Sequence, residues 1–102
     1  MPKYIFAYHG GSMPETEEEG IAEMARWQAW LGGLGDAVID PGAPVGLSKT
    51  VSASGVSDDG GPDPLSGYSI IKASDMNDAI ARIDGCPHIG QGTIEVAEII
   101  EM

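Results

Sequence analysis

Two histidines and one cysteine are the side chains in this sequence best suited to acid–base or nucleophilic chemistry. His9 follows an apolar stretch near the N-terminus, and His88 lies two residues after Cys86. Histidine is the usual acid–base group near neutral pH, so His9 and His88 are the candidate catalytic residues. The alternative for each is a surface or hydrogen-bonded histidine. Cys86 ends a predicted helix, where the helix dipole does not favour a thiolate, so we expect it to be a packing residue.

Aromatic and polar side chains indicate a second kind of site, a small-molecule pocket. Large aromatic rings fill cores and also line apolar ligand pockets. We expect Trp27 in the core, whereas Trp30 lies off the apolar helix face and needs a partner subunit, another segment or a ligand to cover it. Gln28 is a polar residue on an otherwise apolar face. The candidate ligand-binding residues are Trp30, Trp27, Gln28, Tyr68 and Asp40.

Motifs for metals and common cofactors are missing from the sequence. Asp58, Asp59 and Asp63 lack the ligand spacing and terminal glutamate of a calcium loop, so they predict a turn. No set of cysteines and histidines has zinc spacing, and neither a phosphate-binding glycine-rich lysine loop nor a Gly-x-Ser-x-Gly elbow occurs. The sequence therefore predicts no metal and no cofactor.

The overall composition favours a small, acidic, globular protein. The 102 residues fit a single domain over residues 1–102. Sixteen acidic against five basic residues give a net charge of -11, which repels nucleic acids and anionic membranes. No apolar run is long enough for a signal-peptide core or a membrane span, and a single cysteine excludes an intrachain disulfide. We therefore expect a cytoplasmic protein with neither nucleic acid nor membrane as partner.

The first half of the chain predicts a strand and then a long helix. Residues 3–9 alternate in a pattern that predicts a strand with apolar side chains on both faces. Two overlapping capping boxes begin at Ser12 and Thr16 and predict a helix over residues 17–34. The predicted apolar face of this helix centres on Ile21, Met24, Gln28 and Leu31, with Trp27 and Leu34 at its edge.

The second half predicts a long insertion and then a repeat of the same order of elements. Residues 37–39 predict a short strand that Asp40, Pro41 and Gly42 stop. Residues 41–67, rich in Gly, Ser, Pro and Asp, predict an extra hairpin or a lid rather than a helix. The remaining predicted elements are an extended piece over residues 47–53, a strand over 68–73, a helix from Ser74 or Asp75 to Gly85, and a strand over 93–101.

This order of elements predicts a ferredoxin-like α+β fold. Strand, helix, strand occurs twice, which is the split β-α-β-β-α-β arrangement, here with a loop or hairpin inserted between the second and third core strands. Both helices would cover one face of a four-stranded antiparallel sheet. The first and last strands are apolar on both sides, so a second copy of the sheet is the expected cover for the other face. The sequence thus predicts a homodimer.

Short segments along nearly the whole chain also match one family pattern. They are residues 3–8 (KYIFAY), 27–31 (WQAWL), 34–35 (LG), 40–44 (DPGAP), 67–71 (GYSII), 79–80 (AI), 85–87 (GCP) and 93–96 (TIEV). In these segments the chain resembles the YCII-related family of dimeric α+β barrel proteins. The resemblance implies two sheets packed face to face across a dimer, with a cleft beside the sheet.

The chain departs from this family at the positions tied to activity. Some branches carry a histidine on the first helix and an aspartate before the proline that follows the second helix. Here the first helix has no histidine, and Cys86 precedes Pro87. A histidine–aspartate mechanism is therefore not implied. Some relatives are encoded beside sigma factors, which suggests a regulatory setting.

The sequence leaves three functions open and does not decide whether the chain is an enzyme. The first is a homodimer that binds a small molecule. The second is a cofactor-independent enzyme, such as an isomerase, lyase or oxygenase, that uses histidine and tyrosine side chains. The third is an interaction module in a regulatory system. We expect the pocket between the first helix and the sheet, bordered by His9, Trp27, Trp30 and Tyr68, with residues 41–67 as a lid.

Overall fold

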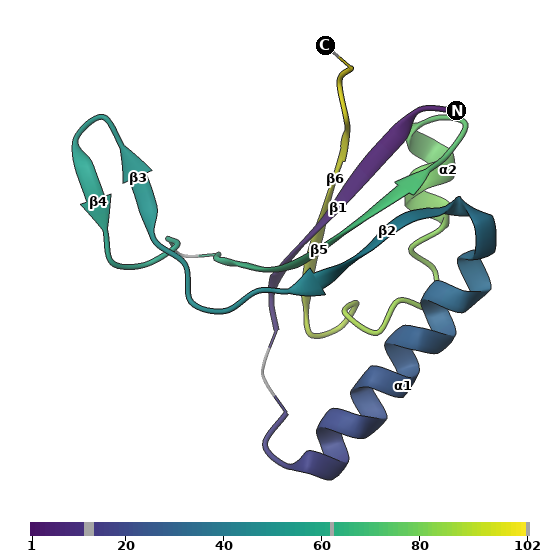
Figure 1. The fold of residues 1–102 in the computed structure, drawn as a ribbon, viewed down its shortest axis with the longest axis horizontal. Coiled ribbons are helices and arrows are strands. Elements are labelled where there is room, and N and C mark those ends of the chain that lie inside the picture. The colour runs from purple at the N-terminus through teal and green to yellow at the C-terminus, as the bar shows by residue number, and fades with distance from the viewer. Residues whose placement is uncertain (12–13, 62, 102) are drawn as a thin grey trace.

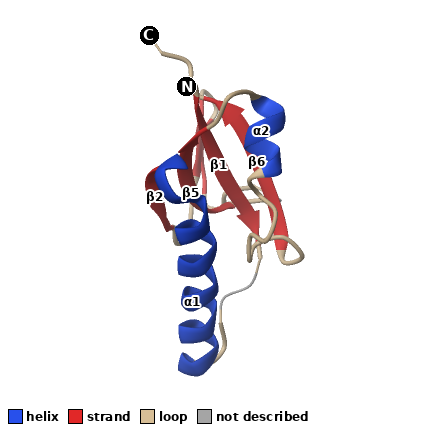
Figure 2. Ribbon diagram, turned by 90° about the vertical axis from the view of Figure 1, so that its right-hand side faces the viewer, coloured by secondary structure: helices blue, strands red, loops and turns tan. Residues whose placement is uncertain are grey.

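A four-stranded antiparallel sheet with two helices on one face forms the body of the protein (Figures 1 and 2). The computed structural model describes residues 1–11, 14–61 and 63–101. The sheet has the strand order β2-β5-β1-β6, so the first strand lies in the interior of the sheet. The elements of this body are β1 (Lys3–Gly10), α1 (Glu17–Leu34), β2 (Val38–Pro44), β5 (Leu65–Lys72), α2 (Met76–Ala81) and β6 (Gly92–Glu98).

This order and pairing make the fold ferredoxin-like, as the sequence predicts. β1 pairs antiparallel with both β5 and β6, and β2 pairs antiparallel with β5. The insertion between the second and third core strands is also present. No helix in the described part of the chain combines the length and the apolar character needed to cross a membrane.

Side-chain caps fix where both helices begin. The Thr16 hydroxyl accepts a hydrogen bond from the Glu19 backbone N–H (3.1 Å), so α1 begins at Glu17 and covers the predicted range. The Glu19 carboxylate in turn accepts from the backbone N–H of Glu15 (2.9 Å). The capping box predicted at Ser12 lies outside the described residues. The cap of α2 is Asp75, whose carboxylate accepts from the backbone N–H of residue 78 at 2.8 Å.

The buried face of α1 differs from the predicted one. Ile21 and Met24 are 71% and 62% exposed, and Gln28 is also exposed. Trp27 and Trp30 instead pack toward the sheet. Figure 2 shows the reason, since the first half of α1 extends beyond the end of the sheet and has no core beneath it. Hydrophobic periodicity alone does not reveal how far a helix overhangs its sheet.

The expected role of Trp30 is also wrong, whereas Trp27 packs against the core as expected but is less buried than Trp30. Trp30 is buried with 8% exposure, and its ring stacks on Phe6 with 6.2 Å between centroids. Its indole N–H donates to the Arg82 carbonyl at 3.2 Å. Trp27 is only half-buried and meets Tyr8 edge to face at 4.9 Å. Trp30 is therefore the deeper core residue, because the helix face turned to the sheet is centred nearer to it than the sequence indicates.

The predicted stop at residues 40–42 is instead an irregular part of β2. The pairing of β2 with β5 shifts register on either side of Asp40, and the strand continues to Pro44. Gly42 permits this continuation, because it has φ +76° and a Cβ there would lie 1.7 Å from the Tyr68 carbonyl oxygen. The Asp40 carboxylate accepts from the Gly42 backbone N–H at 2.8 Å and closes the local turn.

The inserted segment forms a separate hairpin, here called the arm, that projects from the sheet (Figure 1). It consists of β3 (Thr50–Ser52) paired with β4 (Gly55–Ser57). Its strands are shorter than the predicted extended piece over residues 47–53. No helix occurs among the described residues between 45 and 64, which confirms that this segment is not a third helix.

We predict that Trp30→Ala destabilises the fold more than Trp27→Ala. Truncating a buried tryptophan typically costs about 3–5 kcal/mol of the free energy of unfolding, and the half-buried Trp27 should cost less. Urea unfolding followed by circular dichroism measures both values. A larger loss for Trp27→Ala would contradict this assignment of the core.

Candidate functional site

Two shallow depressions lie on either side of the turn formed by Asp84 and Gly85. One, of about 490 Å³, separates α1 from this turn; we call it the Trp30 depression. Its lining includes Arg26, Trp30, Gly33, Leu34, Asp84 and Pro87. The lining therefore combines an aromatic ring and apolar side chains with one cationic and one anionic group.

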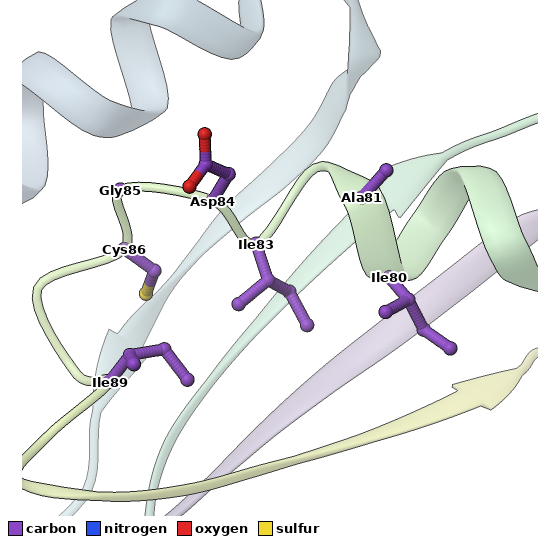
Figure 3. Close-up of a pocket in the computed structure, with 7 residues that line it drawn as sticks. All are labelled: Ile80, Ala81, Ile83, Asp84, Gly85, Cys86 and Ile89. Atoms are coloured by element: carbon purple, nitrogen blue, oxygen red, sulfur yellow. The ribbon is translucent and has the colours of Figure 1, made fainter.

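The second depression, of about 510 Å³, is lined mainly by isoleucine side chains and has no basic residue in its lining. Ile80, Ile83 and Ile89 point into it together with Cys86, whereas the Asp84 side chain points away (Figure 3). Burial raises the pKa of the Cys86 thiol, and nearby backbone amides offset this only in part. Cys86 is therefore a neutral packing residue, as the sequence predicts, although α2 ends at Ala81 and not at the predicted Gly85.

The Arg26 side chain at the edge of the Trp30 depression is paired with Glu23. The Glu23 carboxylate accepts hydrogen bonds from Arg26, from the Trp27 indole N–H (3.1 Å) and from the Gln91 side chain (3.4 Å). Partial burial alone would raise the pKa of Glu23, but these three donors together lower it. An ionised Glu23 thus ties Arg26 to the helix and holds it beside the depression.

His88 belongs to a cluster of aromatic side chains under α1. It is buried, and its ring centroid lies 5.5 Å from that of Tyr8 and 6.4 Å from that of Trp27. His88 Nε2 lies 2.8 Å from the His9 carbonyl oxygen. Because a carbonyl only accepts, Nε2 carries the proton, and a neutral ring then leaves Nδ1 as the basic nitrogen. A Cβ at Gly92 would lie 2.7 Å from this Nε2, so the glycine makes the contact possible.

Tyr8 is held as a neutral hydrogen-bond donor. Its hydroxyl donates to the Ser69 Oγ at 2.9 Å, and Ser69 donates in turn to the Pro41 carbonyl at 2.8 Å. Burial raises the pKa of Tyr8 well above its ordinary value, and the hydrogen bond to Ser69 offsets this only in part. Tyr8 therefore positions neighbouring groups and does not exchange protons near neutral pH.

His9 lies on the opposite, helix-free face of the sheet. Its Nδ1 is 2.9 Å from the Asp63 carbonyl oxygen, and its Nε2 is 3.1 Å from a Glu95 carboxylate oxygen. Both partners accept hydrogen bonds, so both ring nitrogens donate and the ring is favoured as an imidazolium. The Asp63 carbonyl is the main cause of a raised His9 pKa, which burial opposes and Glu95 reinforces.

The structure does not bring the predicted pocket residues into one cleft. Tyr8 and His9 are consecutive residues of β1, so their side chains point to opposite faces. Tyr68 pairs with Ala7 and lies on the helix-free face with His9, whereas Trp27 and Trp30 lie on the helix face. The expected cleft bordered by His9, Trp27, Trp30 and Tyr68 is therefore wrong in its grouping.

The other predicted ligand-binding residues are also dispersed. Gln28 is exposed on α1, and Asp40 is used in the irregular part of β2. Among the five candidates only Trp30 lines the depression that bears its name. Within the described residues no group of three or more histidine, cysteine, aspartate or glutamate side chains is placed to hold a metal ion.

Six residues of these networks are not identified from the sequence: Glu23, Arg26, Ser69, Asp84, Gln91 and Glu95. Ser69 carried a usable signal, because alternation along β5 places it on the same face as the buried Ile71. A polar residue on a core face must find a hydrogen-bond partner. Glu23 and Gln91 carried no such signal, since both are ordinary surface residues by type.

Comparison with known proteins gives a relationship at the level of the fold. No family model and no curated protein matches the chain. The chain is similar in structure to the 5-chloro-2-hydroxyhydroquinone dehydrochlorinase TftG of Burkholderia phenoliruptrix AC1100, solved in complex with 2,5-dihydroxybenzoquinone. The TM-score is 0.58 at 16% sequence identity, over 98% of this chain and 95% of that one. This match shows a shared fold and nothing finer.

We predict that the His9 network makes stability depend on pH. The pKa of His9 in the folded protein is raised above its ordinary value of about 6.5. Protonated His9 therefore contributes fully to the free energy of unfolding below about pH 6.5, and this contribution is lost as the pH rises through the folded-state pKa. The free energy of unfolding of the wild type should fall toward that of His9→Gln over this range. NMR titration should show a lower His9 midpoint in Glu95→Gln, and an unchanged midpoint would contradict the role given to Glu95.

Proposed function

We propose that the chain is a homodimer that binds a small, planar molecule in the Trp30 depression. The observation that carries the proposal is that the buried Trp30 ring lines an open depression together with Arg26 and Asp84. A volume of about 490 Å³ lies within the range of small-molecule sites. An aromatic edge with a nearby cation suits a ring that carries acidic hydroxyl or carbonyl groups.

The structural neighbour adds support to this ligand class. That protein was solved with a dihydroxybenzoquinone, a planar ring that carries oxygen atoms. The identity of the ligand of this chain stays open, and the proposal extends only to a planar apolar or aromatic molecule with acceptor groups.

The surface of the single chain supports the homodimer. It exposes 6932 Å², whereas a compact protein of its mass exposes about 5,500 Å². Its radius of gyration is 14.7 Å, against about 13 Å for a compact chain of 100 residues. The excess of exposed surface, about 1,400 Å², is larger than the roughly 800 Å² that each partner buries in a standard interface. The helix-free face offers the apolar patch for it, formed by Ile5, Ala7, Tyr68 and Ile70.

The proposal also covers the protein family, the cellular location and the partners of the chain. We take residues 1–102 as one domain of the YCII-related type, on the strength of the sequence segments and the distant fold relationship. The acidic charge and the single cysteine support a cytoplasmic protein that binds neither nucleic acid nor membrane.

A cofactor-independent enzyme is the second candidate, and His88 is the residue that favours it. Its Nε2–H is fixed by the His9 carbonyl, so a neutral ring presents Nδ1 as a base. We prefer binding because the other groups nearby that could exchange protons are held in unreactive forms. Tyr8 and Cys86 keep their protons, and His9 is paired with Glu95 on the far face.

We predict that filling the Trp30 depression weakens ligand binding. Gly33 lines the depression, and a Cβ built there meets no atom within 4 Å. Gly33→Leu should weaken binding of 2,5-dihydroxybenzoquinone and related hydroquinones at least about tenfold, which is a loss of about 1.4 kcal/mol. Quenching of tryptophan fluorescence measures it, after correction with a free tryptophan derivative.

Gly32→Leu is the matched control, because Gly32 also has open space around it but does not line the depression. It should bind as the wild type does. Equal losses in both variants, or no saturable quenching of the wild type by any ring of this class, would contradict the proposed binding site. The latter result would favour the interaction module.

We predict that Ile70→Asp converts the homodimer into monomers. Ile70 pairs with Ile5 at the centre of the helix-free face, so a buried carboxylate would oppose association. Sedimentation velocity at micromolar concentration should give a dimer for the wild type and a monomer for Ile70→Asp. Ile21→Asp, at an exposed position of α1, should remain dimeric. A monomeric wild type would refute the homodimer.

A further inference from the structure

The arm exposes apolar side chains that its own chain leaves uncovered. Val51 and Val56 form a cross-strand pair between β3 and β4, and they are 76% and 63% exposed. Leu47, at the base of the arm, is fully exposed. An isolated two-stranded hairpin is marginally stable in water, so such a hairpin usually gains its stability from a surface that it packs against.

The arm is nevertheless specified by local interactions. The Thr50 hydroxyl donates to the Asp59 carbonyl at 3.0 Å, and Lys49 lies 3.5 Å from the Asp58 carboxylate. At the base the two legs approach closely, since a Cβ at Gly60 would lie 2.1 Å from the Ser48 Oγ. The segment thus has a defined shape that presents its valine pair.

The direction of the arm limits what can cover it. It leaves the sheet from the ends of β2 and β5 and projects on the side opposite to α1 and α2 (Figure 1). This is the side of the helix-free face. Within one chain the arm therefore does not act as the predicted lid on a cleft between α1 and the sheet, and it does not cover the Trp30 depression, which lies on the helix side.

We propose that the arm of each subunit packs against the other subunit of the homodimer and buries Val51, Val56 and Leu47 there. This inference rests on the proposed homodimer and adds a second contact to it. A second copy on the helix-free face occupies the side into which the arm projects. The surface excess of about 1,400 Å² over a compact chain also exceeds what one flat sheet contact of standard size would bury.

The second copy explains the arm better than a different protein does. An isologous interface uses each patch twice, so one pair of valines per chain supplies two symmetric contacts. The arm is continuous with the strands β2 and β5 that carry the helix-free face, so its contacts extend the same interface. A different protein partner would have to bind the arm while leaving the larger sheet face to the homodimer.

Adjacent single substitutions in β4 test this inference on the full-length chain. Val56→Asp and Ser57→Asp add the same charge to neighbouring exposed positions, and only Val56 belongs to the apolar pair. Sedimentation equilibrium over a concentration series gives the dimer dissociation constant. We expect Val56→Asp to raise this constant at least about tenfold relative to Ser57→Asp. Circular dichroism checks that both variants are folded.

Hydrogen exchange of the wild type provides a test without substitution. Amides of residues 50–57 should exchange more slowly at protein concentrations above the dissociation constant than below it. A dimeric wild type whose dissociation constant responds equally to both substitutions, with arm exchange independent of concentration, would overturn the role of the arm and leave the homodimer standing. A monomeric wild type at all concentrations would overturn the homodimer and the arm contact together.

Discussion

The alternation of side chains along β1 is the constraint on which the rest of the structure depends. β1 is an interior strand, paired with β5 on one side and β6 on the other, so every side chain on it faces one of two layers. Tyr4, Phe6 and Tyr8 form the core with the tryptophans of α1. Ile5, Ala7 and His9 alternate with them and face away from the helices. This strand thereby separates the helix side of the sheet, where the Trp30 depression lies, from the helix-free face.

Much of the fold follows from local signals in the sequence. The cap at Thr16 and the single glycine after Leu34, Gly35, define α1, because caps and helix breakers act within a few residues. The order of elements, with the insertion before β5, leads to the ferredoxin-like sheet. The buried face of α1 cannot be predicted from the sequence, because it depends on how far the helix overhangs the sheet. Ile21 and Met24 have the spacing of buried residues but are exposed in the overhanging part.

The candidate site was less accessible to sequence reasoning than the fold. The predicted grouping of His9 with Trp27 is wrong because two residues can lie near the same end of a strand and still point to opposite faces of the sheet. Trp30 was identified as a pocket residue, but its burial against Phe6 depends on tertiary packing. The His88 contact with the His9 carbonyl depends on a close approach at Gly92, and a glycine alone does not identify its neighbour.

The most direct measurement is a crystal structure of the chain grown with 2,5-dihydroxybenzoquinone. The account predicts a two-fold dimer in which the helix-free faces of two chains are in contact, with the ring bound beside Trp30 and within reach of Arg26. A structure in which Ile5 and Ile70 face only solvent, or in which the ring binds away from the Trp30 depression, would contradict it.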